Sequence, residues 1–248
     1  LESRVASIKA RAQREAAVDF SRRELHTGPT GSAHIVLRLG QGCHRIDALV
    51  VQRRSEWVPD IDLDVISIPG ADLLGSDDSE STDASTSFCL GSATLGRVHI
   101  TDGPPRGEVL LLHSVSDLPE GLPQRWGPVG IARIAEAIRR HHLRPPGRAL
   151  IYESLGVQGA TVLPLEIEPD GCYLVAGAVV RGLPTGFAIS VDDGLQSSRA
   201  AGPEGAAAAF CANGHADARV ELEATGAEIY WLLAVWQTGR LPLGVESQ

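Results

Sequence analysis

The sequence predicts a mainly β protein with helices, built as two tandem antiparallel β-sandwich domains that are each preceded by one α-helix. The first observation is an internal repeat of about 125 residues, which has the size of a small domain and is too long for a solenoid unit. Its markers occur in the same order in both copies: Gly28, Gly31 and Cys43, then Gly156, Gly159 and Cys172. The second observation is an alternation of apolar and polar residues between Gly, Pro and Asp turns, which is typical of antiparallel strands with one exposed face.

A helix is predicted at the start of each repeat. In the first repeat, apolar residues recur every three or four positions through a charged segment: Val5, Ile8, Ala12, Ala16 and Phe20. In the second repeat, residues 131–140 show the same periodicity and are followed by Pro145 and Pro146. This spacing is typical of an amphipathic helix, and the two prolines end it.

Short strands are predicted after each helix. Val98 and Ile100 alternate with polar residues, and Val220 and Leu222 do the same in the second repeat. The predicted strands are 33–39, 46–51 and 60–68 in the first repeat and 161–167, 174–180 and 186–191 in the second. Because they are rich in Ser, Asp and Gly, the segments 75–87 and 197–205 are predicted to be loops. The repeat places one domain at residues 1–122 and the other at 123–248.

The four cysteines indicate the compartment. Each repeat contains two, at corresponding positions: Cys43 and Cys89, then Cys172 and Cys211. No C-x-x-C or Cys/His zinc spacing occurs. Pairing within each repeat is one of three connectivities, and the duplication favours it. Two disulfides would place the protein outside the cytoplasm, whereas four buried free thiols would indicate a cytosolic protein.

One segment resembles a known family. Residues 60–78 form an acidic strand, a Gly70 turn and a short apolar step into Ser and Asp, and residues 191–198 keep the turn without the acidic strand. This order is similar to that of the bacterial pre-peptidase C-terminal domain. The resemblance covers about two-thirds of each repeat and leaves out the helices. It implies a small jelly-roll-like sandwich that acts as a binding or stabilising accessory module of secreted enzymes and surface proteins.

Acidic residues of the first repeat suggest a calcium site. Asp60, Asp62 and Asp64 alternate with apolar residues and would project from one face of a strand. Calcium takes oxygen ligands at about 2.3–2.6 Å, and strand neighbours on one face are farther apart than that allows, so a loop carboxylate such as Asp77 would have to take part. The alternative is a solvated strand face beside an acidic loop. His26, His34 and His44 could suggest a transition-metal site, with scattered turn histidines as the alternative.

Aromatic residues are the candidates for a binding surface. Tyr230 and Trp231 are adjacent, so on a strand they face opposite sides, and Trp236 follows closely. An exposed aromatic could stack on a sugar or anchor a protein partner. The alternative is that these rings pack in a core.

The sequence contains no motif of an activated nucleophile, metalloprotease or nucleotide site. With a net charge of −9 and no basic stripe, the chain does not suit nucleic acid. Its longest apolar run is too short to span a membrane, and a start at Leu1 without Met suggests a processed or trimmed chain. We therefore predict a non-enzymatic extracytoplasmic binding or assembly module, periplasmic, cell-surface or secreted, without a cofactor unless calcium binds. Its partner would be a protein or a glycan at the cell surface. The alternative is a secreted hydrolase with its site between the two repeats.

Overall fold

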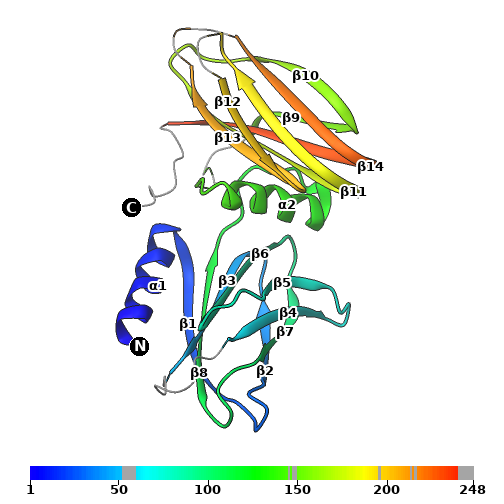
Figure 1. Cartoon of the computed structure of the whole chain (residues 1–248). Coiled ribbons are helices and arrows are strands. Elements are labelled where there is room, and N and C mark those ends of the chain that lie inside the picture. The colour runs from blue at the N-terminus through cyan, green and yellow to red at the C-terminus, as the bar shows by residue number, and fades with distance from the viewer. Residues whose placement is uncertain are drawn as a thin grey trace. The chain divides into compact units, whose positions relative to one another are not determined.

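The computed structural model describes residues 1–51, 60–144, 146, 150–194, 197–212, 214 and 217–239. They form two compact units, unit 1 (Leu1–Asp117) and unit 2 (Leu118–Gln248). Most of these residues lie in antiparallel strands, with two α-helices (Figure 1). The prediction of a mainly β chain with antiparallel sheets and helices is confirmed. Among the helices of the described residues, none has the length and apolar character needed to cross a membrane.

Unit 1 consists of one helix and eight strands among the described residues. They are α1 (Glu2–Arg14), β1 (Ala17–His26), β2 (Ala33–Leu39), β3 (Gly42–Val50), β4 (Asp62–Ile68), β5 (Leu73–Asp77), β6 (Asp83–Leu90), β7 (Thr94–Thr101) and β8 (Glu108–Ser116). Two four-stranded sheets result, in the orders β1-β8-β3-β6 and β2-β7-β4-β5. Buried apolar residues of both sheets, such as Ile46 and Leu111 of the first and Leu63 and Val98 of the second, form one core.

Unit 2 contains longer strands. Its elements are η1 (Gln124–Trp126), α2 (Gly127–Arg140), β9 (Leu150–Val157), β10 (Gly159–Glu166), β11 (Cys172–Asp192), β12 (Ser197–Gly202), β13 (Gly205–Cys211) and β14 (Asp217–Thr238). Strands β11 and β14 pair with each other along almost their whole length. The first part of β14 also pairs with β10 and its second part with β9, while the first part of β11 pairs with β13 and its second part with β12.

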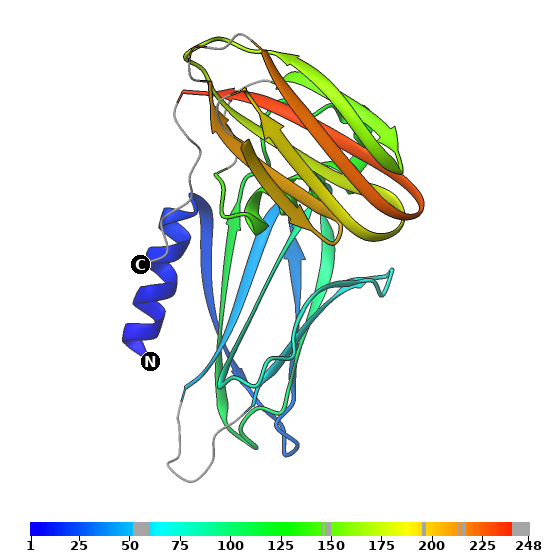
Figure 2. The same cartoon turned by 45° about the horizontal axis from the view of Figure 1, so that its top comes forward.

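The strand pairings of unit 2 therefore follow those of unit 1. The order β9-β14-β11-β13 corresponds to β1-β8-β3-β6, and β10-β14-β11-β12 corresponds to β2-β7-β4-β5. The difference is that the single strand β11 takes the positions of both β3 and β4, and the single strand β14 takes those of both β7 and β8. Figure 2 shows β14, coloured from orange to red, passing through both parts of the sheet.

Two glycines allow β11 and β14 to turn the corner between these parts. Gly182 and Gly226 have φ of 104° and 136°, in a region that side-chain-bearing residues rarely adopt. A Cβ at Gly226 would lie 2.2 Å from the carbonyl oxygen of Leu183, and one at Gly182 would lie 2.5 Å from that of Glu228. The pairing register of the two strands shifts in the same region. The corner thus depends on close backbone approach that only glycine permits.

The first helix is shorter than the periodicity predicts. It ends at Arg14, Ala16 has a φ of 54°, and β1 begins at Ala17. Phe20 therefore lies on a strand, but it still packs with Val5 and Ile8 of the helix in one apolar cluster. The three-to-four spacing was misleading because strand and helix contribute to the same cluster.

The two segments predicted to be loops also contain strands. Residues 75–87 include the end of β5 and the start of β6, and residues 197–205 include β12. These strands lie at sheet edges and carry Ser, Asp and Gly, which hide the alternation that identifies central strands.

Both disulfides join neighbouring strands at the same pairing position. Cys43 of β3 is bonded to Cys89 of β6, at a sequence separation of 46, and Cys172 of β11 to Cys211 of β13, at a separation of 39. The described residues include no free cysteine. Two disulfides indicate an extracellular or secreted protein.

Candidate functional site

The two long sides of the unit 1 sandwich differ. Along the side where β5 and β6 meet, the backbone N–H of Ser85 donates to the Asp77 carboxylate at 2.6 Å. Gly75 lets the strands approach, because a Cβ there would lie 2.5 Å from Oγ1 of Thr86. Along the other side, where the edge strands β1 and β2 lie, a groove of about 540 Å³ remains. A volume of this size is in the range of small-molecule sites.

Residues of both sheets line this groove, which we call the β1–β2 groove. Its lining residues are Asp19, Ser21, Arg23, Val36, Leu37, Arg38, Gly40, His44, His113 and Val115. The pairing register places His113 opposite Ser21 on one neighbour and opposite Ile46 on the other, so these three side chains share the core-facing side of the sheet. Two histidines thus stand where the sandwich would otherwise have apolar residues.

The two histidines form a hydrogen-bonded pair. His44 is buried, with an exposed fraction of 1%, and its Nε2 lies 3.0 Å from the carbonyl oxygen of Gly40. Since a carbonyl only accepts, His44 Nε2 carries the proton, and its Nδ1 is the acceptor. His113 Nε2, 2.9 Å from that Nδ1, is then the donor. Neutral His113 keeps its own Nδ1 as an acceptor.

The two histidine rings are stacked, and His113 is a weak base. The His44 ring lies nearly parallel to the rings of Phe88 and His113, with centroids 5.4 and 5.2 Å away. Burial lowers the pKa of His113 to about 4, with a further lowering from His44 and Arg23 that Asp19 opposes. A base this weak suits hydrogen bonding at neutral pH better than proton abstraction.

The corresponding positions of unit 2 are closed. Counted from the disulfide cysteines along the paired strands, they hold other residues: Tyr152 for Ser21, Ser154 for Arg23, Tyr173 for His44, and Val235 for His113. Tyr152 packs against the unit 2 core, and Tyr173 is fully buried. The polar groups of the β1–β2 groove are therefore not needed to build this scaffold.

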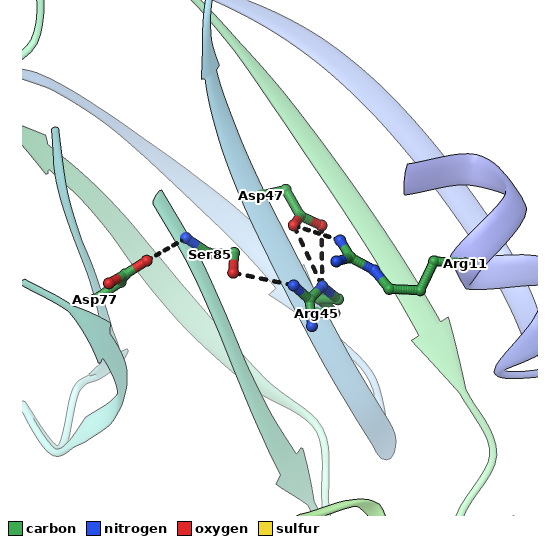
Figure 3. Close-up of polar contacts among 5 residues, drawn as sticks. All are labelled: Arg11, Arg45, Asp47, Asp77 and Ser85. Carbon is green, nitrogen blue, oxygen red and sulfur yellow. Dashed lines mark hydrogen bonds and ion pairs between the residues drawn. The ribbon is translucent and has the colours of Figure 1, made fainter. Parts of the chain in front are cut away.

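A second polar cluster of unit 1 holds the helix. Figure 3 shows Arg11 of α1 donating to Asp47 of β3 at 2.8 Å, and Arg45 donating to the same carboxylate at 3.2 Å. Arg45 also donates to Ser85 Oγ at 3.0 Å, and Ser85 N–H reaches Asp77 (Figure 3). Asp47 is 4% exposed, so two arginines compensate a buried charge. This chain of contacts links the helix to β3, β6 and β5.

The predicted calcium ligands are not brought together. Asp77 lies opposite Leu63, a core residue, while Asp64 lies opposite Ser76, so Asp77 and Asp64 face different sides of the sheet. Burial would raise the pKa of Asp77, but hydrogen bonds from Ser85 and Ser79 outweigh it and lower that pKa.

The remaining aspartates stay on the outer side. The Asp60 carboxylate accepts the N–H of Ser81 at 3.0 Å. Partial desolvation and the nearby charges of Asp102, Asp60, Asp78 and Asp64 raise the pKa of Asp62. Among the described residues, no three Asp, Glu, His or Cys side chains are grouped closely enough to hold a metal ion.

Two of the three aromatic candidates are core residues, which corrects the predicted binding surface. Trp231 and Trp236 have exposed fractions of 1% and 0%, and Tyr230 has 47%. The indole N–H of Trp231 donates to Val157 O, and that of Trp236 to Glu120 O. Tyr230 and Trp231 do face opposite sides of the strand, as adjacent strand residues must. Trp231 is buried because it packs in the sandwich core, and Trp236 is buried because it packs under α2. Tyr230 alone lies at the surface, beside Arg181.

Only one of the two paired histidines, His44, was a functional candidate from the sequence. His44 stood out with His26 and His34, yet the structure pairs it with His113, 69 residues away. His26 and His34 are exposed. The available signal was alternation: His113 shares its phase with Leu111 and aligns with Val235, so it is a polar residue in a core-facing position.

No protein-family model and no characterised protein sequence matches the chain. Solved structures give weak likenesses. The PBSX exported protein XepA is 13% identical, with 88% of this chain and 87% of that chain covered and a TM-score of 0.31. The tandem CBM22-1–CBM22-2 domain of Paenibacillus barcinonensis Xyn10C is 10% identical, with 90% and 95% covered and a TM-score of 0.26. Likenesses at these TM-scores carry no argument about this chain.

Proposed function

We propose that the chain is a non-catalytic, extracytoplasmic binding or assembly module made of two tandem jelly-roll-like domains, each with a preceding helix. The strand orders of both units and the equivalent disulfides support a duplicated scaffold. The disulfides support a periplasmic, cell-surface or secreted location. The partner is a glycan or a protein of the cell surface.

The observation that carries this proposal is the difference between the units at the β1–β2 groove. Unit 2 fills the position of Ser21 with Tyr152 and that of His113 with Val235. The scaffold does not require the polar residues of the groove, so we infer that they serve a ligand. Weakly basic His113 supports binding over hydrolysis.

The test is to fill the groove with the residue of unit 2. The full chain and its Ser21→Tyr variant are compared on an array of surface glycans and cell-wall fragments. We expect binding of the parent chain and at least a tenfold loss in Ser21→Tyr, because the ring occupies the ligand's place. Arg22→Tyr is the matched control, since Arg22 is next to Ser21 on the opposite face of β1. Equal binding by Ser21→Tyr and the parent would exclude the groove as the site.

A further inference from the structure

One arginine from each sheet lines the β1–β2 groove. Arg23 lies on β1, the edge of one sheet, and Arg38 lies on β2, the edge of the other, where it alternates with the core residues Leu37 and Leu39 and so lies at the rim of the groove. Neither arginine forms an ion pair within the described part of the chain. The equivalent positions in unit 2 hold Ser154 and Glu166, so the pair of cations is confined to unit 1. Guanidinium groups are the side chains best suited to bind a carboxylate through paired N–H donors.

The groove also presents acceptors. The Asp19 carboxylate is close enough to His113 to act on its pKa. His113 Nδ1 is a second acceptor, because the proton of the neutral ring lies on Nε2, which donates a hydrogen bond to His44 Nδ1. Ser21, opposite His113 on β1, supplies a hydroxyl that can donate or accept. His113 itself adds no charge to the floor of the groove at neutral pH, because burial lowers its pKa to about 4.

These groups limit the ligand. A simple anion would pair with the arginines but would meet repulsion from Asp19 and leave His113 Nδ1 without a donor. A neutral sugar would satisfy the acceptors but leave two cations uncompensated. A ligand with one carboxylate and several hydroxyls uses both sets, and hydroxyl donors to a carboxylate make strong, charge-assisted hydrogen bonds. The cavity of about 540 Å³ admits a molecule of that kind.

We propose that the β1–β2 groove binds an acidic sugar, with its carboxylate between Arg23 and Arg38 and its hydroxyls donating to Asp19 and His113. This inference rests on the proposed function, because it names the ligand class of the same groove. An acidic peptide is the competing occupant. It brings carboxylates but no hydroxyls, so it leaves the acceptors of Asp19 and His113 unused.

The test uses the full chain and four probes: glucuronate, glucose, acetate and a tri-glutamate peptide. Binding is followed by the NMR shift of the His113 ring protons, which report on the groove directly. We expect glucuronate to bind at least tenfold more tightly than glucose, acetate or tri-glutamate. Arg23→Ala and Arg38→Ala should each remove most of the preference for glucuronate over glucose. Asp19→Asn should weaken glucuronate and glucose alike and leave acetate unchanged or stronger. Arg97→Ala is the matched control, since Arg97 lies on β7 outside the groove lining.

The outcomes separate the two proposals. The acidic-sugar inference would be overturned if Ser21→Tyr abolishes binding on the array and the parent chain binds glucuronate and glucose with equal affinity. The groove would then still be a binding site. Tighter binding of tri-glutamate than of glucuronate would overturn it in favour of a peptide partner. Absence of any Ser21→Tyr-sensitive binding, on the array and with all four probes, would overturn the proposed function itself.

Discussion

His44 and His113 occupy positions that a sandwich core normally gives to apolar side chains. Unit 2 shows this alternative, with Tyr173 and Val235 in their places. The pair is tolerated because each buried nitrogen with a proton has an acceptor: Gly40 O for His44 and His44 Nδ1 for His113. That arrangement requires the His44 ring to be neutral, because its Nδ1 accepts a hydrogen bond. Protonation of His113 would put a charge beside a buried ring.

Acid should therefore destabilise unit 1 in a defined window. The folded pKa of His113 is about 4, below the ordinary 6.5 of an unfolded chain, so the unfolded state binds more protons between these values. The stabilisation is complete above pH 6.5 and is lost as the pH falls toward 4. We expect a loss of about 2 kcal/mol after allowance for solvent in the groove. Urea unfolding at pH 7 and pH 4.5 measures it.

The comparison chain is the His44→Tyr, His113→Val double variant, which copies unit 2. It should lose that part of the pH dependence. His34→Gln removes an exposed histidine and should keep the dependence in full. A double variant as acid-sensitive as the parent would show that other groups cause the effect.

At this scale, sequence reasoning found the residue types but not their contacts. His44 and Asp77 were both identified as functional candidates, each for a metal. The structure gives His44 a partner from β8 and Asp77 a partner from β6. Both contacts join strands that are distant in the chain, and no local pattern reports which strand becomes a neighbour. The opposite faces of Tyr230 and Trp231 followed from strand periodicity alone.

Helices α1 and α2 are attached to their sheets by different interactions. Helix α2 buries six residues, among them Ile131, Ile134 and Ile138, against the sheet of unit 2. Helix α1 fully buries Ala12 alone and is held by the ion pairs Arg4–Asp83, Arg11–Asp47 and Glu2–Arg22, beside its apolar cluster. Charge therefore contributes more to the attachment of α1, and apolar burial contributes more to that of α2.

Loss of Asp47 should loosen α1. In Asp47→Ala, which copies Ala176 of unit 2, Arg11 and Arg45 lose their shared acceptor. We expect amide hydrogen exchange in α1 to become about tenfold faster, with α2 unchanged.

The control for this prediction is Glu204→Ala. It removes the Arg133–Glu204 ion pair of α2 but leaves the isoleucine face intact, so exchange in α2 should stay slow. If α1 were as protected in Asp47→Ala as in the parent chain, its apolar contacts with Leu49 and Leu110 would be the main attachment.

Strands with a clear apolar face were predictable, at the centre and at the edge of a sheet alike. The strands found from alternation, such as the edge strand 33–39 and the central strand 46–51, pack an apolar face in the core. The edge strands β1, β5, β9 and β12, which are richer in polar residues, went unrecognised. These edge strands expose more polar side chains and face solvent along one backbone edge, so their alternation is weak. In β1 the apolar Phe20 even continued the helical spacing of α1.

On the scale of the whole molecule, the disulfides contribute much of the stability. Each closes a loop of several tens of residues, 46 for Cys43–Cys89 and 39 for Cys172–Cys211. The chain-entropy model gives about 4 kcal/mol for each. We expect four thiols only after reduction, and a reduced chain that unfolds at clearly lower urea. Thiol titration and urea unfolding before and after reduction test this.

Paired cysteine-to-alanine variants separate the two contributions. Cys43→Ala with Cys89→Ala should affect unit 1, and Cys172→Ala with Cys211→Ala should affect unit 2, by similar amounts. Reduction without any shift of the unfolding curve would mean that the cores suffice, and the argument for an oxidising compartment would lose its physical basis.

The continuous strands of unit 2 have a consequence for motion. Because β11 and β14 run through both parts of its sheet, a displacement of one part pulls on the other through covalent backbone. In unit 1 the sheets are separate, and along the β5–β6 side the Asp77–Ser85 hydrogen bond spans between them. The two sheets of unit 1 are thus joined by side-chain contacts and turns, whereas the two parts of the unit 2 sheet share the backbone of β11 and β14.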